Sequence, residues 1–486
     1  MKKYLLLAFS LTLFSSCKEK NQPNIVFISI DDFRKDLAED VIHTPHMDEL
    51  SNNAAVFTNH YVQVPTCGAS RQALLTGMRP ISRSHLKNSI TAETIANKEE
   101  EEHPETFIHH LKRNGYYTVG IGKISHSADG LVYEYEEKPS SKRELPYSWT
   151  ELVFNPGKWK TGWNAFFAYA DGENRQSMKK QVKPYEAGEV EDDGYPDGLS
   201  TQLALEKLND LKSRKQPFFL GLGFFKPHLP FNSPKKYWDL YDEEAINVTH
   251  SPNIPKNINT KSLQRSGEFN QYLLGDEFAS LEKPISDEYA RKLRHAYYAA
   301  TSYIDAQVGL VIDKLKAEGL YDNTIIVIWG DHGWHLGDQR VWGKHTLFDN
   351  ALRSQLIIKS VNNSASMKIE SIIESVDIYP TLIEMCNLTS PKKLDGESFV
   401  PLLNNESNDY QNLAYSYFNN GISLRTSQYR LTKYFREDLP LIELYDHDKD
   451  PFETINIAQN KPDLVNQLLP ILAKGNTGLY EANSTK

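Results

Sequence analysis

The chain has 486 residues, of which 40% are apolar and 11% aromatic, and its formal net charge is −10. This length exceeds one ordinary hydrophobic core, so we expect one large α/β domain with a smaller appendage. The acidic balance argues against nucleic acid as a partner, because neutralising phosphates requires a concentrated basic surface. It does not exclude an anionic substrate, since a local cluster of Lys, Arg and His would be sufficient to bind one.

The first residues of the chain predict an export signal. Two lysines after Met1 precede the apolar run 4–14, which is shorter than the roughly 20 residues that span a bilayer. The small residues before Cys17 loosely match a bacterial lipobox, so residues 1–17 are interpreted as a lipoprotein signal peptide and Cys17 as the site of a lipid anchor. We therefore expect an exported protein, periplasmic or at the cell surface, anchored in the outer membrane of a Gram-negative bacterium. A plain secreted protein is the alternative.

Four apolar runs predict strands that are buried on both faces in a parallel sheet. They cover residues 24–30, 117–121, 217–225 and 324–329. Helical patterns precede the last three runs, at residues 104–115, 199–212 and 286–318. The first of these helices is expected to begin at Pro104 and Glu105, because proline suits a first turn, and to end near Asn114 and Gly115. This alternation of strands and helices predicts an α/β fold.

Polar or ionisable residues follow each of the four predicted strands. They are Asp31 and Asp32, Lys123 and His126, Lys226 and His228, and Asp331 and His332. Ligands of open α/β sheets bind outside the carboxyl ends of the strands, so we expect these side chains to converge. The three aspartates offer hard oxygen ligands that suit Ca²⁺ or Mg²⁺. Taken alone, Asp31 and Asp32 could instead be a helix cap or a turn pair.

The remaining segments are less regular. Residues 131–197 are rich in Tyr, Trp, Lys and Glu with weak periodicity, and we interpret them as long loops over the pocket. Cys386 lies in the helical pattern 378–388 as an expected core residue, so no disulfide framework is predicted. Residues 404–412 resemble a linker in composition. After it, antiparallel strands are expected at residues 422–424, 429–434 and 441–445, and a terminal helix follows them.

One short motif is the most informative feature of the chain. Cys67-Gly-Ala-Ser-Arg71 is followed by Gln-Ala-Leu-Leu-Thr-Gly, which places a thiol at the start of a predicted short helix and an arginine one turn later. The motif resembles the core signature of the sulfatases, Cys-x-Pro/Ala-x-Arg with a Leu-Thr-Gly tail. On its own it leaves an alternative, in which Cys67 is a small apolar residue beside a helix cap.

The resemblance extends over nearly the whole chain and is closest to the iduronate-2-sulfatase branch. Its marks are Gly-Lys-x-x-His at Gly122, Lys-Pro-His at Lys226 and Asp-His-Gly-Trp at Asp331. It implies an alkaline-phosphatase-like α/β fold, in which helices sandwich a large mixed, mostly parallel sheet. It also implies a catalytic domain over residues 24–403 and a smaller C-terminal α+β subdomain over residues 413–486 that carries the antiparallel sheet.

The resemblance implies the catalytic residues as well. They are Cys67, Arg71, Lys123, His126, His228 and Lys344. In the family a maturation enzyme oxidises the cysteine to formylglycine, an aldehyde whose hydrate supplies the nucleophile. Arg71, Lys123 and Lys344 would contact the hydrate or the sulfate, and His126 would help to release sulfate. His228 is the expected general acid, because an imidazole can be protonated near neutral pH.

The metal site implied by the resemblance would hold Ca²⁺, with Mg²⁺ as the other possibility. Its ligands would be Asp31, Asp32, Cys67, Asp331 and His332. His332 stands where many sulfatases carry Asn, and Ala69 stands where proline is commoner. Three further histidines have no role that we can assign from the sequence, namely His46, His60 and His335.

These implications predict a sulfuric ester hydrolase that acts on a sulfated oligosaccharide. Ulvan, fucan and glycosaminoglycans are the candidate sources, and a 2-O-sulfated uronate is the favoured substrate. One alternative is a phosphonate or phosphodiester hydrolase of the same superfamily, because a fold does not determine a function. The other is a catalytically silent glycan-binding lipoprotein that is never matured. The intact Lys123, His126, His228 and Lys344 argue against the silent form.

Overall fold

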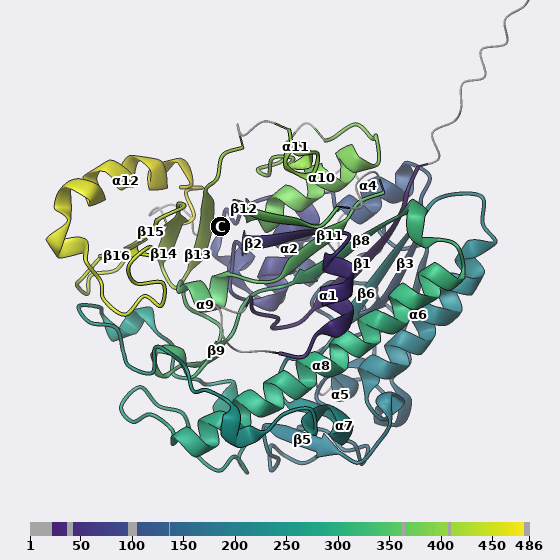
Figure 1. The fold of residues 1–486 in the computed structure, drawn as a ribbon, viewed down its shortest axis with the longest axis horizontal. Helices are drawn as coiled ribbons and strands as arrows, with labels where there is room; N and C mark the ends of the chain where they lie inside the picture. Colours follow the sequence, from purple (N-terminus) through teal and green to yellow (C-terminus); the bar gives the residue numbers. More distant parts are fainter. Residues whose placement is uncertain are drawn as a thin grey trace, which may run out of the picture.

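An eight-stranded sheet runs through the middle of the molecule (Figure 1). The computed structural model describes residues 22–35, 42–95, 105–135, 137–361, 365–391, 393–406 and 410–480. The strands of the large sheet are β1 (Asn24–Ile30), β2 (Ala55–Tyr61), β3 (Tyr117–Gly122), β4 (Glu151–Val153), β6 (Phe218–Phe224), β8 (Thr324–Gly330), β11 (Leu356–Lys359) and β12 (Met367–Glu374). Their order across the sheet is β12-β2-β11-β8-β1-β6-β3-β4.

The sheet is mixed and mostly parallel, as expected. The strands β8, β1, β6 and β3 lie side by side and run in the same direction. These are the four strands that the apolar runs predict. Strand β11 is antiparallel to both of its neighbours, β8 and β2. The carboxyl ends of the four predicted strands therefore meet at one edge of the sheet.

Helices cover both faces of this sheet (Figure 1). The helices α1 (Pro45–Ser51), α6 (Pro196–Lys212) and α8 (Asp287–Ala317) pack on one face, where they share a hydrophobic core with alternate residues of β1 such as Val26 and Ile28. On the other face α2 (Cys67–Thr76), α4 (Phe107–Arg113) and α10 (Ile378–Met385) pack against Ile25 and Phe27. Burial on both faces explains why the parallel strands are apolar throughout. No described helix combines the length and the apolar character needed to span a membrane.

The C-terminal part of the chain forms a separate antiparallel sheet, on the left in Figure 1. Its strands are β13 (Ala414–Phe418), β14 (Gly421–Arg425), β15 (Tyr429–Tyr434) and β16 (Ile442–Asp446), and α12 (Pro462–Lys474) packs against it. The predicted antiparallel sheet is therefore present, with β13 as a strand that the sequence did not indicate. A buried ion pair between Arg430 and Glu453 links this part to the rest, since Glu453 also accepts a hydrogen bond from the Asp349 amide at 2.9 Å.

Shorter α-helices and strands lie between the elements already named. They are α3 (Ile90–Thr94), α5 (Gly162–Phe166), α7 (Lys235–Trp238), α9 (Asp349–Leu352), α11 (Val400–Leu403), β5 (Tyr185–Gly188), β7 (Phe231–Pro234), β9 (His335–Leu336) and β10 (Trp342–Gly343). The helix expected from Pro104 begins later, at Phe107, because the hydroxyl of Thr106 caps it by accepting a hydrogen bond from the His109 amide at 3.1 Å. Pro104, the predicted export signal and Cys17 lie outside the described residues.

Candidate active site

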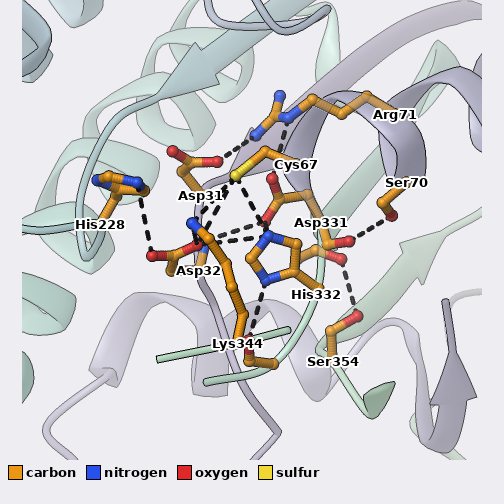
Figure 2. A network of polar contacts seen from close by, with 12 residues as sticks. Asp31, Asp32, Cys67, Ser70, Arg71, His228, Asp331, His332, Lys344 and Ser354 are labelled. Carbon is orange, nitrogen blue, oxygen red and sulfur yellow. Dashed lines mark hydrogen bonds and ion pairs between the residues drawn. The ribbon is translucent and has the colours of Figure 1, made fainter. Parts of the chain in front are cut away.

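The polar residues that follow the four parallel strands converge around one cysteine (Figure 2). Asp31 and Asp32 follow β1, and Asp331 and His332 follow β8. Lys123 follows β3 and His228 lies beyond β6. Their convergence follows from the parallel pairing of these strands, whose carboxyl ends share one edge. The sequence therefore placed these side chains correctly relative to the sheet.

Cys67 is the first residue of α2, a helix that ends in the left-handed Gly77, which has a φ of 63°. Its sulfur lies 3.2 Å from Lys344 Nζ, 3.3 Å from His332 Nε2 and 4.0 Å from Asp32 Oδ1. Burial, and after it the charge of Asp31, raises the pKa of the thiol to about 12. The thiol is therefore protonated at neutral pH, and the site does not make it a reactive thiolate.

Arg71, one turn along α2, ties the site together. Its guanidinium is fully buried, and it donates hydrogen bonds at 3.0 Å to Asp331 Oδ2 and to Asp31 Oδ1. It also donates to the Ser29 hydroxyl at 3.0 Å and to the backbone carbonyl of Lys123. All of these partners stand at the ends of β1, β3 and β8. Arg71 thus holds three strand ends in place, so it acts here as a structural brace as well as a candidate contact for the nucleophile.

The carboxylates differ in how they are compensated. Lys123 Nζ lies 2.6 Å from Asp31 Oδ2. Burial raises the pKa of Asp31, but the charges of Lys123 and Arg71 outweigh it and hold this pKa well below its ordinary value. Burial raises the pKa of Asp32 well above its ordinary value, although Lys344 opposes it from 2.9 Å. Burial and the neighbouring Asp31 also raise the pKa of Asp331.

These acids form a cluster that could hold a metal ion. Ligand atoms of Asp31, Asp32, Cys67 and His228 lie within 4.8 Å of one another, and so do those of Cys67, Asp331 and His332. Asp32 Oδ2 is buried and has no hydrogen-bond partner among the described residues, and the Asp32 backbone takes a left-handed conformation with a φ of 56°. A buried carboxylate oxygen without a partner is costly, so a cation here would satisfy it.

His228 is held at both ring nitrogens. Nδ1 lies 2.6 Å from the backbone carbonyl of Leu229, and Nε2 lies 2.9 Å from Glu268 Oε1 and 3.8 Å from Asp32 Oδ2. Burial, and then the charge of Lys344, lowers the pKa of His228 to about 4, while Glu268 acts in the opposite direction. Because the Leu229 carbonyl can only accept a hydrogen bond, the first ring proton lies on Nδ1, and a hydrogen bond between Nε2 and Glu268 requires a second proton. No pattern in the sequence indicated Glu268, because it lies in a segment without periodicity.

A pocket of about 690 Å³ opens onto Cys67. It is lined by five of the predicted catalytic residues, namely Cys67, Lys123, His126, His228 and Lys344. His126 Nδ1 is buried, and no group in the described part of the chain forms a hydrogen bond with it. Tyr135, Phe166 and Arg175 also line the pocket, so the segment 131–197 does lie over it as expected. Part of that segment is regular, since it includes β4, α5 and β5.

The structure also places other residues that the sequence analysis singled out. The loop that carries His228 is buried, and the exposed fractions of Lys226 and His228 are 1% and 3%. Lys226 does not line the pocket; it donates hydrogen bonds to the carbonyls of His228 at 2.9 Å and of Pro230 at 2.7 Å. His60 and His335 lie outside the pocket, where they contact Ser375 Oγ at 2.8 Å and Thr346 Oγ1 at 2.7 Å.

Comparisons with known proteins agree with this geometry. A family model described as sulfatase matches residues 23–388, and a model described as N-sulphoglucosamine sulphohydrolase, C-terminal, matches residues 330–474. A sulfatase of Formosa agariphila is 29% identical, over 93% of this chain and 87% of that protein. The iduronate 2-sulfatase of Mus musculus is 28% identical, over 83% of this chain and 78% of that protein.

Solved structures show the same fold. A phosphonate monoester hydrolase from Silicibacter pomeroyi superposes with a TM-score of 0.74 at 22% identity, covering 96% of this chain and 97% of that one. The family model spans most of the chain, including the cysteine motif and the acids at the ends of β1 and β8. The chain therefore belongs to the sulfatase family and is a sulfuric ester hydrolase.

Proposed function

We propose that the protein hydrolyses sulfate esters of carbohydrates with a formylglycine that is formed from Cys67. The main support is the position of this residue at the start of α2, between Lys344 and His332. An unmodified thiol with a pKa of about 12 is a poor nucleophile at neutral pH. The hydrate of an oxidised side chain supplies a hydroxyl nucleophile that does not depend on ionisation of the thiol.

The donor set around Cys67 fits a divalent cation. Asp31, Asp32 and Asp331 supply the oxygen ligands that Ca²⁺ and Mg²⁺ prefer, and the unpartnered Asp32 Oδ2 faces the cluster. His332 adds an imidazole, since its Nδ1 lies 2.9 Å from the Gly333 carbonyl and its Nε2 is turned towards Cys67. A bound Ca²⁺ or Mg²⁺ would act as a Lewis acid on the sulfuryl oxygens. We favour Ca²⁺ because most of the ligands are carboxylates.

Two lysines of the pocket lie near the position proposed for the sulfuryl group of the substrate. Lys123 and Lys344 line the pocket together with Cys67, and each forms an ion pair with one carboxylate of the cluster. Cys67 stands at the start of α2, where the positive end of the helix dipole favours an anion, and the Gly68 amide there donates a hydrogen bond to Asn88 Oδ1 at 3.0 Å. Together they would bind the sulfuryl oxygens and stabilise the charge that develops on them.

Two histidines are placed to move protons. His228 and Glu268 both line the pocket, and His228 Nε2 lies 2.9 Å from Glu268 Oε1. Because burial lowers the pKa of His228 to about 4, we propose that the proton given to the departing sugar oxygen is one that His228 shares with Glu268. His126 also lines the pocket, and burial, followed by the charge of Lys123, lowers its pKa well below the ordinary value. A neutral His126 is the form that can accept a proton. We therefore assign it to the release of sulfate from the second hydroxyl of the hydrate.

We infer that the natural substrate is a sulfated oligosaccharide of ulvan, fucan or glycosaminoglycan type, with a 2-O-sulfated uronate favoured. The similarity to an iduronate 2-sulfatase supports the uronate. We also propose that a maturation enzyme acts on Cys67, and that Cys17 carries a lipid anchor that holds the exported protein at the outer membrane of a Gram-negative bacterium.

The alternative is a phosphonate or phosphodiester hydrolase, since a phosphonate monoester hydrolase has the same fold. Two measurements separate the possibilities. Mass spectrometry of the peptide that contains residue 67 should show a loss of about 18 Da relative to cysteine, as expected when a nucleophilic aldehyde is formed. Kinetics on matched sulfate and phosphate esters should show higher kcat/KM for sulfate. An unmodified Cys67 in fully active protein would refute the mechanism, and activity confined to phosphodiesters would refute the substrate class.

A further inference from the structure

Arg175 is a buried cation without a carboxylate partner. It lies between α5 and β5, and only 6% of its surface is exposed. Its Nε has no hydrogen-bond partner, and no carboxylate of the described residues lies within ion-pairing distance of its guanidinium. The buried arginines Arg71 and Arg430 differ, because each of them pairs with an acid. Burying an unpaired charge is costly, so this site is incomplete as it stands.

The guanidinium is held in place by aromatic rings. Its central carbon lies 3.7 Å from the ring centroid of Phe167 and 5.5 Å from that of Tyr272. The Tyr272 hydroxyl is likewise buried without a hydrogen-bond partner. Burial raises the pKa of Tyr272, and the charge of Arg175 partly opposes this effect. Among the described residues, no carboxylate accepts a hydrogen bond from Arg175 Nε or from the adjacent Tyr272 hydroxyl, so both groups can donate to an anionic ligand.

This pair lies beside the proposed reaction centre. Arg175 lines the same pocket as Cys67, and Phe167 also contacts the imidazole of His228, with 6.3 Å between ring centroids. One aromatic ring thus separates the unpaired guanidinium from the proposed proton donor. The inner lysines are different, since Lys123 and Lys344 are already paired with acids of the cluster. Arg175 is therefore a second cationic position in the pocket.

A second cation stands at the rim on the same turn. Lys180 is exposed and lines the pocket, and no described carboxylate pairs with it. Its amide donates a hydrogen bond to the Arg175 carbonyl at 2.8 Å, and its carbonyl accepts one from the Leu273 amide at 2.9 Å. The turn 175–180 therefore holds both side chains on the pocket wall. The buried fork of Arg175 can bind an oxyanion by two parallel hydrogen bonds, while Lys180 adds charge from the solvent side.

We propose that Arg175, assisted by Lys180, binds a second anionic group of the substrate, which is either the carboxylate of a uronate or a further sulfate next to the ester that is cleaved. This inference rests on the proposed carbohydrate sulfatase function and specifies its substrate as a sugar with two anionic groups. Carboxylate and sulfate both match the planar fork of arginine. The site selects substrates, and the sulfuryl group that reacts binds elsewhere, at Cys67.

The test compares substrates that differ only in the second anion. The set consists of a 2-O-sulfated uronate disaccharide, its carboxyl-reduced counterpart, and the reduced sugar with an added second sulfate. Wild-type protein should prefer the charged sugars in kcat/KM by about 10- to 100-fold, which is the range for a charge-assisted hydrogen bond. Arg175→Gln should reduce this preference towards one, and Arg175→Lys should retain part of it. The group that Arg175 naturally binds is a carboxylate if wild-type protein has its highest kcat/KM on the uronate. It is a sulfate if wild-type protein has its highest kcat/KM on the reduced sugar with the added sulfate.

Two controls make the result decisive. Lys179→Gln removes an exposed charge from the same turn at a side chain outside the pocket, and should leave the preference unchanged. Calorimetry with Cys67→Ala protein measures binding of the same sugars without turnover, and adding Arg175→Gln should weaken only the binding of the charged ones. An unchanged preference in Arg175→Gln, or an equal loss on all sugars, would overturn the inference. Absence of sulfate release by wild-type protein would refute the proposed function, and the calorimetric comparison would still decide the role of Arg175.

Discussion

Replacing His228 by Gln should separate protonation of the leaving group from attack on the sulfuryl group. The ring is oriented by the 2.6 Å contact of Nδ1 with Leu229 and the 2.9 Å contact of Nε2 with Glu268. A proton donor in such a fixed position contributes about 10²–10⁴-fold to the rate, which corresponds to roughly 3–5 kcal/mol in the activation free energy. A sugar alkoxide is a poor leaving group, so turnover of a carbohydrate sulfate should fall by this amount.

An aryl sulfate provides the internal comparison. Its phenolate leaves without full protonation, so its turnover should fall by about tenfold or less. Glutamine preserves most of the volume that packs against Phe166, whose ring centroid lies 4.6 Å from that of His228. The matched control is His345→Gln, which changes another histidine of the pocket, stacked on Phe418 at 5.4 Å. The assay is sulfate release from both substrates, with melting temperatures recorded for each variant. Equal losses on the sugar and the aryl ester would remove His228 from the role of acid.

Two further substitutions test the metal site and the helix start. Asp331→Asn removes one carboxylate from the cluster, so it should abolish both activity and the rise in melting temperature on addition of Ca²⁺, and metal analysis checks the loss of the ion. The control is Asp349→Asn, in an acidic cluster whose charge is already compensated by arginines, and it should leave the metal content unchanged. Gly68→Ala would place a Cβ 2.2 Å from the Asn88 carbonyl oxygen, so it should lower the free energy of unfolding by about 1–3 kcal/mol and reduce activity by displacing Cys67. Gly267→Ala, which meets nothing within 4 Å, is the comparison for stability by denaturant unfolding, and equal values for the two glycine variants would contradict the prediction.

The sequence determined the half of the site that lies on regular structure. A strand buried on both faces is continuously apolar, so the ends of β1 and β8 could be located from composition alone, and with them Asp31 and Asp331. Parallel pairing then brings residues 299 or 300 positions apart to one edge, as in the 2.9 Å hydrogen bond from the Asp32 amide to Asp331 Oδ1. Local periodicity was sufficient to predict these positions, because parallel strands that pair side by side have their carboxyl ends next to each other.

The tertiary structure alone decided the other half. Glu268 and Arg175 come from irregular segments, where no periodic pattern predicts the direction of a side chain. Lys226 and His228 are two residues apart, yet one braces its own loop and the other faces the pocket, because the turn directs their side chains differently. Strand β2 escaped prediction because polar residues interrupt it and its pairing partners, β11 and β12, are distant in sequence. Such positions depend on contacts that form only when separate loops pack over the same sheet edge, so no local pattern encodes them.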